Sequence, residues 1–117
     1  MFKNTSEFFF LELKKDYYGK DAINDDIAMT LNNIGVVLAG QKKRKEALEK
    51  YNQALEMFKA LYGPIAKNGH IAMSFYNIGQ IKCAMGQFHQ AGTYLREALA
   101  LRRHIYGHVA MSSLHKL

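Results

Sequence analysis

The side chains best suited to chemistry in this sequence are five histidines and one cysteine. His104 and His108 are four residues apart, a spacing that can place two imidazoles on one helix face beside a zinc ion. However, Gly107 is expected to break the helix between them, and no carboxylate lies nearby in the sequence. Cys83 has no histidine or aspartate fixed beside it to activate a nucleophile, and is interpreted as a small groove or core residue. We therefore predict no metal site, no cofactor and no catalytic residue.

A dense run of positive charge, Lys42-Lys43-Arg44-Lys45, is the second feature that could bind a ligand. We expect it at a turn and at the start of a helix, where the helix dipole disfavours cations. The main interpretation is a solvated edge. The alternative is a contact with an acidic peptide, RNA or an anionic lipid surface. No aromatic residue interleaves with the run, which weakens the case for nucleic acid. Neither nucleic acid nor a membrane is the expected partner.

The remaining composition argues against an enzyme and for a helical protein inside the cell. No phosphate-binding loop, nucleophile elbow or paired-carboxylate site is present. The chain is 49% hydrophobic and 22% charged, and it contains a single proline, which favours a folded all-α protein. One cysteine allows no internal disulfide, so a reducing, cytoplasmic setting is expected. The net charge of +6 favours an acidic partner.

The elements that must position these residues follow from an internal repeat of 44 positions. This shift aligns Ile27-Ala28-Met29 with Ile71-Ala72-Met73, and Asn33-Ile34-Gly35 with Asn77-Ile78-Gly79, without a gap. It also aligns the three Tyr-Gly pairs at Tyr18, Tyr62 and Tyr106. Such self-similarity is typical of solenoid proteins.

The apolar residues recur at steps of three and four, which predicts a helix for each segment of the repeat. We expect a leading helix over 5–18, a first pair over 25–40 and 43–62, and a second pair over 69–84 and 87–106. Glycine near residues 40 and 86 is expected to turn the chain within each pair, and each Tyr-Gly to end a second helix. Asn24 is the expected N-cap of the helix that follows it.

Small residues are expected where the two helices of a pair cross. Gly35, Ala47 and Ala54 occupy these places in the first pair, and Gly79, Ala91 and Ala98 repeat them in the second. Together with Leu31, Ile34, Leu38 and Tyr51, the first set resembles the signature of the tetratricopeptide repeat. The longer period and the segment Leu61-Tyr62-Gly63 resemble the extended repeats of kinesin light chains and nephrocystin-like proteins.

The resemblance implies an α-solenoid, a right-handed superhelix of about five helices plus a short C-terminal fragment, which acts as a protein-protein interaction scaffold. Its peptide-binding groove would be lined by the first helix of each pair, at Asn32, Val36, Ala39, Tyr76, Gln80 and Cys83. A plain solvent-exposed face is the alternative. Asn33 and Asn77 lie next to the groove, where they either join it or hold the inter-helix turn together. The Lys and Asn that clamp a terminal carboxylate in some relatives are missing, so chaperone tails are not expected as ligands.

The ends of the array are irregular. We interpret 1–117 as one array: a lone second helix over 5–18, repeats over 25–63 and 69–107, and the truncated start of a third repeat over 108–117. Lys82 and Arg44 stand where the other repeat has the apolar residues Leu38 and Phe88. Because repeats bury their faces on neighbours, Phe8, Phe9 and Phe10 are expected to be exposed. The chain would then be a fragment of a longer array or would self-associate.

Overall fold

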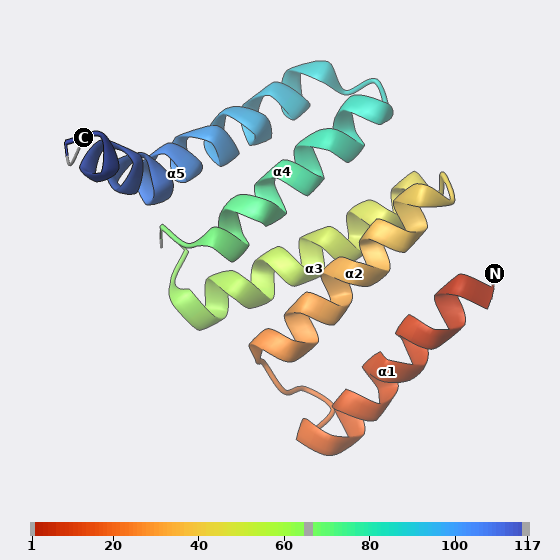
Figure 1. Ribbon diagram of the computed structural model, residues 1–117. Helices are drawn as coiled ribbons and strands as arrows, with labels where there is room; N and C mark the ends of the chain where they lie inside the picture. Colours follow the sequence, from red (N-terminus) through yellow and green to blue (C-terminus); the bar gives the residue numbers. More distant parts are fainter. Residues whose placement is uncertain (1, 65–66, 116–117) are drawn as a thin grey trace.

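The computed structural model describes the backbone of residues 2–64 and 67–115 and the side chains of residues 6–64 and 67–107. The described chain contains no strand, and its helices are, in order, α1 (Phe2–Tyr18), α2 (Asp25–Gly40), α3 (Arg44–Tyr62), α4 (Gly69–Ala84) and α5 (Phe88–His115) (Figure 1). The predicted all-α class is confirmed.

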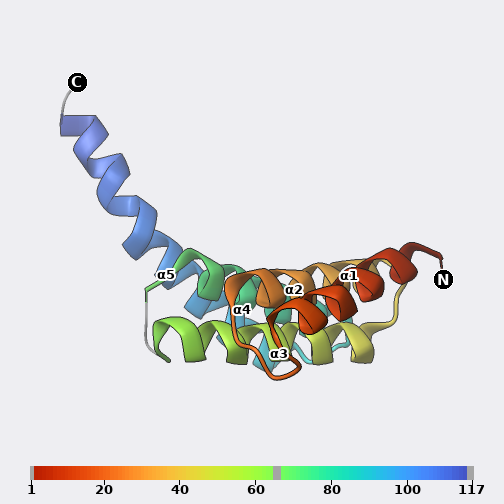
Figure 2. The same ribbon diagram turned by 90° about the horizontal axis from the view of Figure 1, so that it is seen from below.

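The helices are stacked in sequence order. Extensive contacts between described residues join only consecutive helices, from α1 with α2 to α4 with α5. Seen from below, α2 and α4 lie in one layer and α3 in the other (Figure 2). This arrangement is that of an α-solenoid, in which each unit packs on its neighbours rather than around one central core.

The close approach of paired helices depends on glycine, as the spacing predicts. A Cβ added to Gly35 would lie 2.6 Å from ring atoms of Tyr51, and one added to Gly79 would lie 2.7 Å from Leu95. Ala47 and Ala54 are both completely buried. The same contact therefore occurs in both repeats, with an aromatic partner in the first and an aliphatic one in the second.

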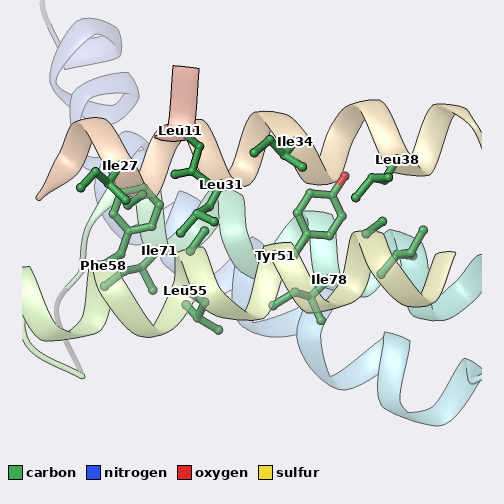
Figure 3. Close-up of a cluster of buried hydrophobic side chains, with 14 residues drawn as sticks. Leu11, Ile27, Leu31, Ile34, Leu38, Tyr51, Leu55, Phe58, Ile71 and Ile78 are labelled. Carbon is green, nitrogen blue, oxygen red and sulfur yellow. The ribbon is translucent and has the colours of Figure 1, made fainter. Parts of the chain in front are cut away.

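A continuous cluster of apolar side chains runs through the stack (Figure 3). Phe58, Ile34 and Ile78 are completely buried in it, and Leu11 joins it from α1 at 3% exposure. Burying each such side chain contributes about 1.5–3 kcal/mol to folding. By contrast Phe9 and Phe10 on α1 are 60% and 51% exposed, which confirms their predicted exposure.

The helix starts agree with the sequence prediction at α2. The Asn24 side-chain oxygen accepts a hydrogen bond of 2.8 Å from the Ile27 amide and so caps the helix. Asn68 does the same for α4, accepting from the His70 amide at 2.7 Å. Each cap satisfies an amide that the first helical turn leaves without a partner.

The helix α2 ends at Gly40 as predicted, but one turn and one helix end differ from the sequence prediction. The turn after α2 does not use Gly40: Lys42 has the left-handed backbone, with φ 64°, at the position where the second repeat has Gly86 with φ 79°. The expected stop at Gly107 is wrong. Unlike Gly19 and Gly63, Gly107 has no positive φ, and α5 continues to His115. Pro64 and the Asn68 cap follow Gly63, whereas no proline or asparagine follows Gly107.

Candidate functional site

The first two expected groove residues, Asn32 and Tyr76, occupy equivalent positions but different surroundings. Asn32 is only 3% exposed, because Asn77 of α4 covers it and donates a hydrogen bond of 2.9 Å from its side-chain nitrogen to the Asn32 side-chain oxygen. This oxygen is therefore occupied within the chain. Asn32 and Asn77 link two repeats, so Asn32 belongs to the repeat boundary and not to an open groove.

Tyr76 is 37% exposed, and its polar atoms are engaged locally. The side-chain nitrogen of Gln80 donates a hydrogen bond of 2.7 Å to the Tyr76 hydroxyl. The Arg102 guanidinium of α5 lies 5.4 Å from the centre of the Tyr76 ring. Such a cation near an aromatic ring is attracted by the electron-rich face. Three side chains from two helices thus form one exposed polar and aromatic surface.

The other expected groove residues are accessible. Val36 is 50% exposed, Cys83 is exposed, and Ala39 is partly buried. Ala39 and Gln80 also share a hollow of about 220 Å³ that α2, α3 and α4 enclose, and its other lining residues are Arg44, Tyr51, Asn77, Ile81 and Ala84. Burial raises the pKa of the Tyr51 hydroxyl above its usual value. Of the expected groove residues, Ala39 and Gln80 therefore line the same hollow, whereas Asn32 is not among its lining residues.

The basic run is exposed, and its Arg44 borders this hollow. Lys42, Lys43, Arg44 and Lys45 form neither a hydrogen bond nor an ion pair through their side chains with any other described residue. Together with Glu46, Ala84 and Met85 they line an open depression of about 610 Å³. Lys43 is at the N-cap of α3 but makes no side-chain cap. Arg44 lines both depressions, so the hollow and the basic run form a continuous surface.

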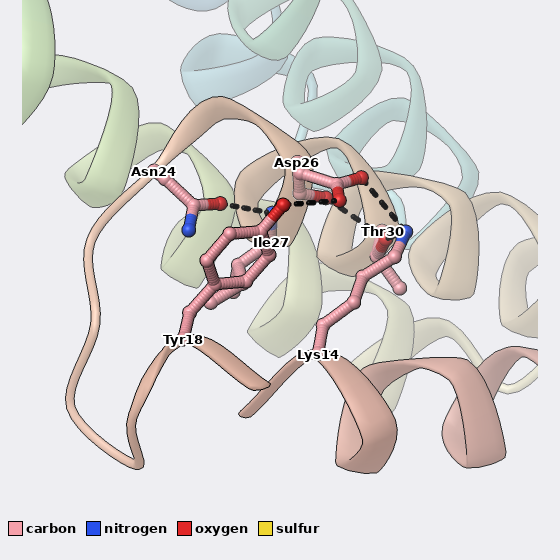
Figure 4. Close-up of polar contacts among 6 residues, drawn as sticks. All are labelled: Lys14, Tyr18, Asn24, Asp26, Ile27 and Thr30. Carbon is pink, nitrogen blue, oxygen red and sulfur yellow. Dashed lines mark hydrogen bonds and ion pairs between the residues drawn. The ribbon is translucent and has the colours of Figure 1, made fainter. Parts of the chain in front are cut away.

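The junction between α1 and α2 contains a polar network that the sequence analysis missed (Figure 4). The Lys14 ammonium lies 2.8 Å from the Asp26 carboxylate and donates a hydrogen bond of 2.7 Å to the Thr30 hydroxyl. The Tyr18 hydroxyl donates to the same carboxylate at 3.4 Å. The Lys14 hydrogen bond, with its charge, holds the pKa of Asp26 below its usual value.

The next junction uses stacked rings at the equivalent positions. Phe58 replaces Lys14, and His70 replaces Asp26. The two rings are 4.9 Å apart and within 6° of parallel, and Tyr62 stacks 6.3 Å from His70. Tyr62 also donates a hydrogen bond to Asp25, which raises the pKa of the tyrosine. Corresponding residues therefore meet at both junctions, although their chemistry differs.

A larger cleft, also not predicted, lies between α3 and the segment that joins α1 to α2. It has a volume of about 670 Å³, its floor is formed by Ile27 and Leu31, and Glu49 and Glu56 lie on its α3 wall. The residue equivalent to Leu31 in the second repeat is the larger Phe75, whose ring centre lies 5.9 Å from that of Tyr94.

Among the described residues, no three histidine, cysteine or acidic side chains come together in a way that could hold a metal ion. His104 is exposed, while the side chain of His108 lies outside the described residues. No described helix is long and apolar enough to cross a membrane.

The fold and the repeated helix contacts define an α-solenoid whose surface grooves lie between adjacent units. The family model described as the tetratricopeptide repeat matches residues 27–70 and again residues 71–109. The chain belongs to the tetratricopeptide-repeat family. No curated protein matches the sequence significantly. Repeats of this family generally mediate interactions between proteins, and they typically form scaffolds rather than enzymes.

Proposed function

We propose that this chain is a scaffold that binds a peptide segment of a partner protein along the surface between α2 and α4. The observation that carries the proposal is the hollow bordered by Ala39 and Gln80, with Val36, Tyr76 and Cys83 exposed on the same two helices. An aliphatic side chain, an aromatic ring and an amide can together receive one apolar and one polar group of a peptide. Asn32 is not part of this binding surface.

The charge at one end of the hollow favours a peptide with an acidic residue. Arg44 lines the hollow, and the three lysines beside it make no ion pair among the described residues. A carboxylate bound there would meet positive potential and the N-terminus of α3. We expect affinity for such a peptide to fall as salt concentration rises.

A matched pair of variants tests the groove. Peptides selected from an unbiased display library on the wild-type protein would be measured by fluorescence anisotropy against Ala39→Arg and Ala100→Arg. The first variant fills the hollow, and the second makes the same change at an exposed position of α5. We expect Ala39→Arg to weaken binding at least about tenfold, with Ala100→Arg close to wild type. Equal affinities for all three proteins, or no enriched peptide, would reject the groove.

A further inference from the structure

The positive charge of this protein is concentrated in its second half. Residues 57–117 contain one acidic residue, Glu97, against seven lysines and arginines, and they hold all five histidines. Residues 1–56 contain equal numbers of acidic and basic side chains. The net charge of +6 therefore belongs to the part of the chain that includes α4 and α5. Such an asymmetry points to an acidic partner for that part.

The second repeat also presents a face that the first repeat buries. The helix α4 covers this face of the first repeat, because its His70 stacks on Phe58 and its Asn77 donates a hydrogen bond to Asn32. Phe58 and Asn32 are 0% and 3% exposed. The equivalent residues of the second repeat are Arg102, which is exposed, and Tyr76, which is 37% exposed. We call the surface formed by Tyr76, Leu99, Arg102 and Tyr106 the distal face. Its Leu99 and Tyr106 are 48% and 59% exposed.

The two junctions within the chain show what chemistry the distal face requires. Each preceding helix offers a residue pair, one turn apart, to the first turn of the helix that docks on it: Lys14 and Tyr18, then Phe58 and Tyr62. The first pair meets Asp26 (Figure 4), and the second meets His70. The third pair is Arg102 and Tyr106. It matches the first pair, a cation followed by tyrosine, and not the second.

The polar groups of this third pair lack a partner within the described chain. Arg102 contacts the Tyr76 ring but forms no hydrogen bond or ion pair with a described residue. Tyr106 reaches the position equivalent to that of Tyr62, with its hydroxyl 3.5 Å from where a Cβ of Gly69 would lie. Tyr62 donates to Asp25 there, whereas Gly69 offers no side chain. Both Arg102 and Tyr106 line one open depression of about 630 Å³, together with Arg103 and Gly107.

We propose that the distal face binds an amphipathic helix of a partner protein, whose first turn presents a carboxylate to Arg102 and Tyr106. The bound carboxylate would take the place that Asp26 takes against Lys14 and Tyr18. Its apolar stripe would cover Leu99 and the Tyr76 ring. This site rests on and deepens the proposed scaffold function. It shares Tyr76 with the surface between α2 and α4, but Arg102 and Tyr106 belong to the distal face alone and Ala39 to the hollow alone, so variants of these residues test the two sites separately.

A charge-swap experiment tests the proposal with a defined probe. The probe is a labelled peptide of residues 21–40, because this helix already places Asp26 against a cation and a tyrosine. Its binding to wild-type protein and to Arg102→Glu would be measured by fluorescence anisotropy, beside a probe with Asp26→Lys. We expect Arg102→Glu to weaken binding of the native probe at least about tenfold, and to restore binding of the lysine probe. Ala39→Arg should leave both affinities unchanged.

The outcomes separate the other possible occupants. Equal binding of the native probe to wild type and Arg102→Glu, or no saturable binding of the probe, would overturn the proposal. A concentration-dependent dimer in sedimentation that Arg102→Glu abolishes would assign the face to a second copy, and salt-sensitive binding of a single-stranded RNA that depends on Arg102 would assign it to nucleic acid. Either result would overturn the assignment of the distal face to a partner helix. Unchanged helical circular dichroism of Arg102→Glu confirms that the exposed substitution leaves the fold intact.

Discussion

The side-chain nitrogen of Asn77 donates a hydrogen bond of 2.9 Å to the side-chain oxygen of Asn32, and this bond joins α4 to α2 across the boundary between repeats. Because Asn32 is 3% exposed, its side-chain oxygen has little contact with water while Asn77 is in place. The surface of the first repeat on which α4 packs is therefore a buried contact between the two repeats.

Removing the donor of this bond should destabilise the boundary. Asn77→Ala leaves the buried Asn32 oxygen without a partner, which costs about 1–3 kcal/mol of unfolding free energy. Urea denaturation followed by circular dichroism measures the loss. The matched double variant Asn32→Leu with Asn77→Ala removes the stranded polar group, and it should recover part of the stability. A double variant no more stable than Asn77→Ala would contradict this account.

The close helix crossing at Gly35 predicts a steep steric cost. In Gly35→Ala the new Cβ would lie 2.6 Å from Tyr51 ring atoms, so the helices or the ring must shift, and we expect a loss of about 1–3 kcal/mol. Gly40→Ala is the control, because nothing lies within 4 Å of its Cβ and its φ is not positive. That change should be neutral or stabilise the helix by up to about 1 kcal/mol. Similar melting temperatures for the two variants would argue against the crossing.

The left-handed backbone of Lys42 provides a stabilising prediction. Lys42→Gly should remove about 1 kcal/mol of backbone strain, partly offset by the entropy that glycine adds to the unfolded chain. The second repeat already has Gly86 at the same place. Both Lys42→Gly and Lys42→Ala remove the positive charge, but only Lys42→Gly also removes the Cβ. Comparing their melting temperatures therefore separates the effect of backbone conformation from that of charge. The glycine variant should melt at the higher temperature, and the reverse order would show that φ is not the controlling factor.

The ion pair between Lys14 and Asp26 predicts a dependence on pH. In the folded protein the pKa of Asp26 is lowered from its usual 3.8. The ion pair therefore contributes its full stability above the unfolded pKa, and this stability is lost as the pH falls through the lower pKa of the folded state. The difference in melting temperature between wild type and Asp26→Asn should therefore shrink below about pH 4. High salt at pH 7 should also reduce it, because the carboxylate is exposed. A difference that stays constant from pH 7 to pH 3 would rule out this role.

Much of the fold could be predicted because the repeat aligns residues under the same packing constraint. Gly35 with Gly79, and Ala54 with Ala98, recur wherever two helices cross, so their spacing defines each pair. The surroundings of Asn32 could not be predicted in this way. Whether a side chain is open or covered depends on the angle at which the next repeat docks, and a 44-residue shift contains no information about that angle.

The junction contacts were missed for a related reason. Lys14 and Phe58 occupy equivalent positions but differ in type, as do Asp26 and His70, so each alignment looks like a mismatch. The pattern becomes visible only when the facing residues are compared as pairs. Likewise, Gly107 was expected to act like Gly63, but the residues after a glycine also determine whether a helix ends there.

The restriction of extensive contacts to consecutive helices has a consequence for how the molecule reaches its fold. Every large interface closes a short stretch of chain, so the entropy lost in forming it is small and contact order is low. Folding can begin at any one junction and spread to the next in either direction. The chain therefore has no single obligatory nucleus, and its order of assembly can change when the relative strengths of its junctions change.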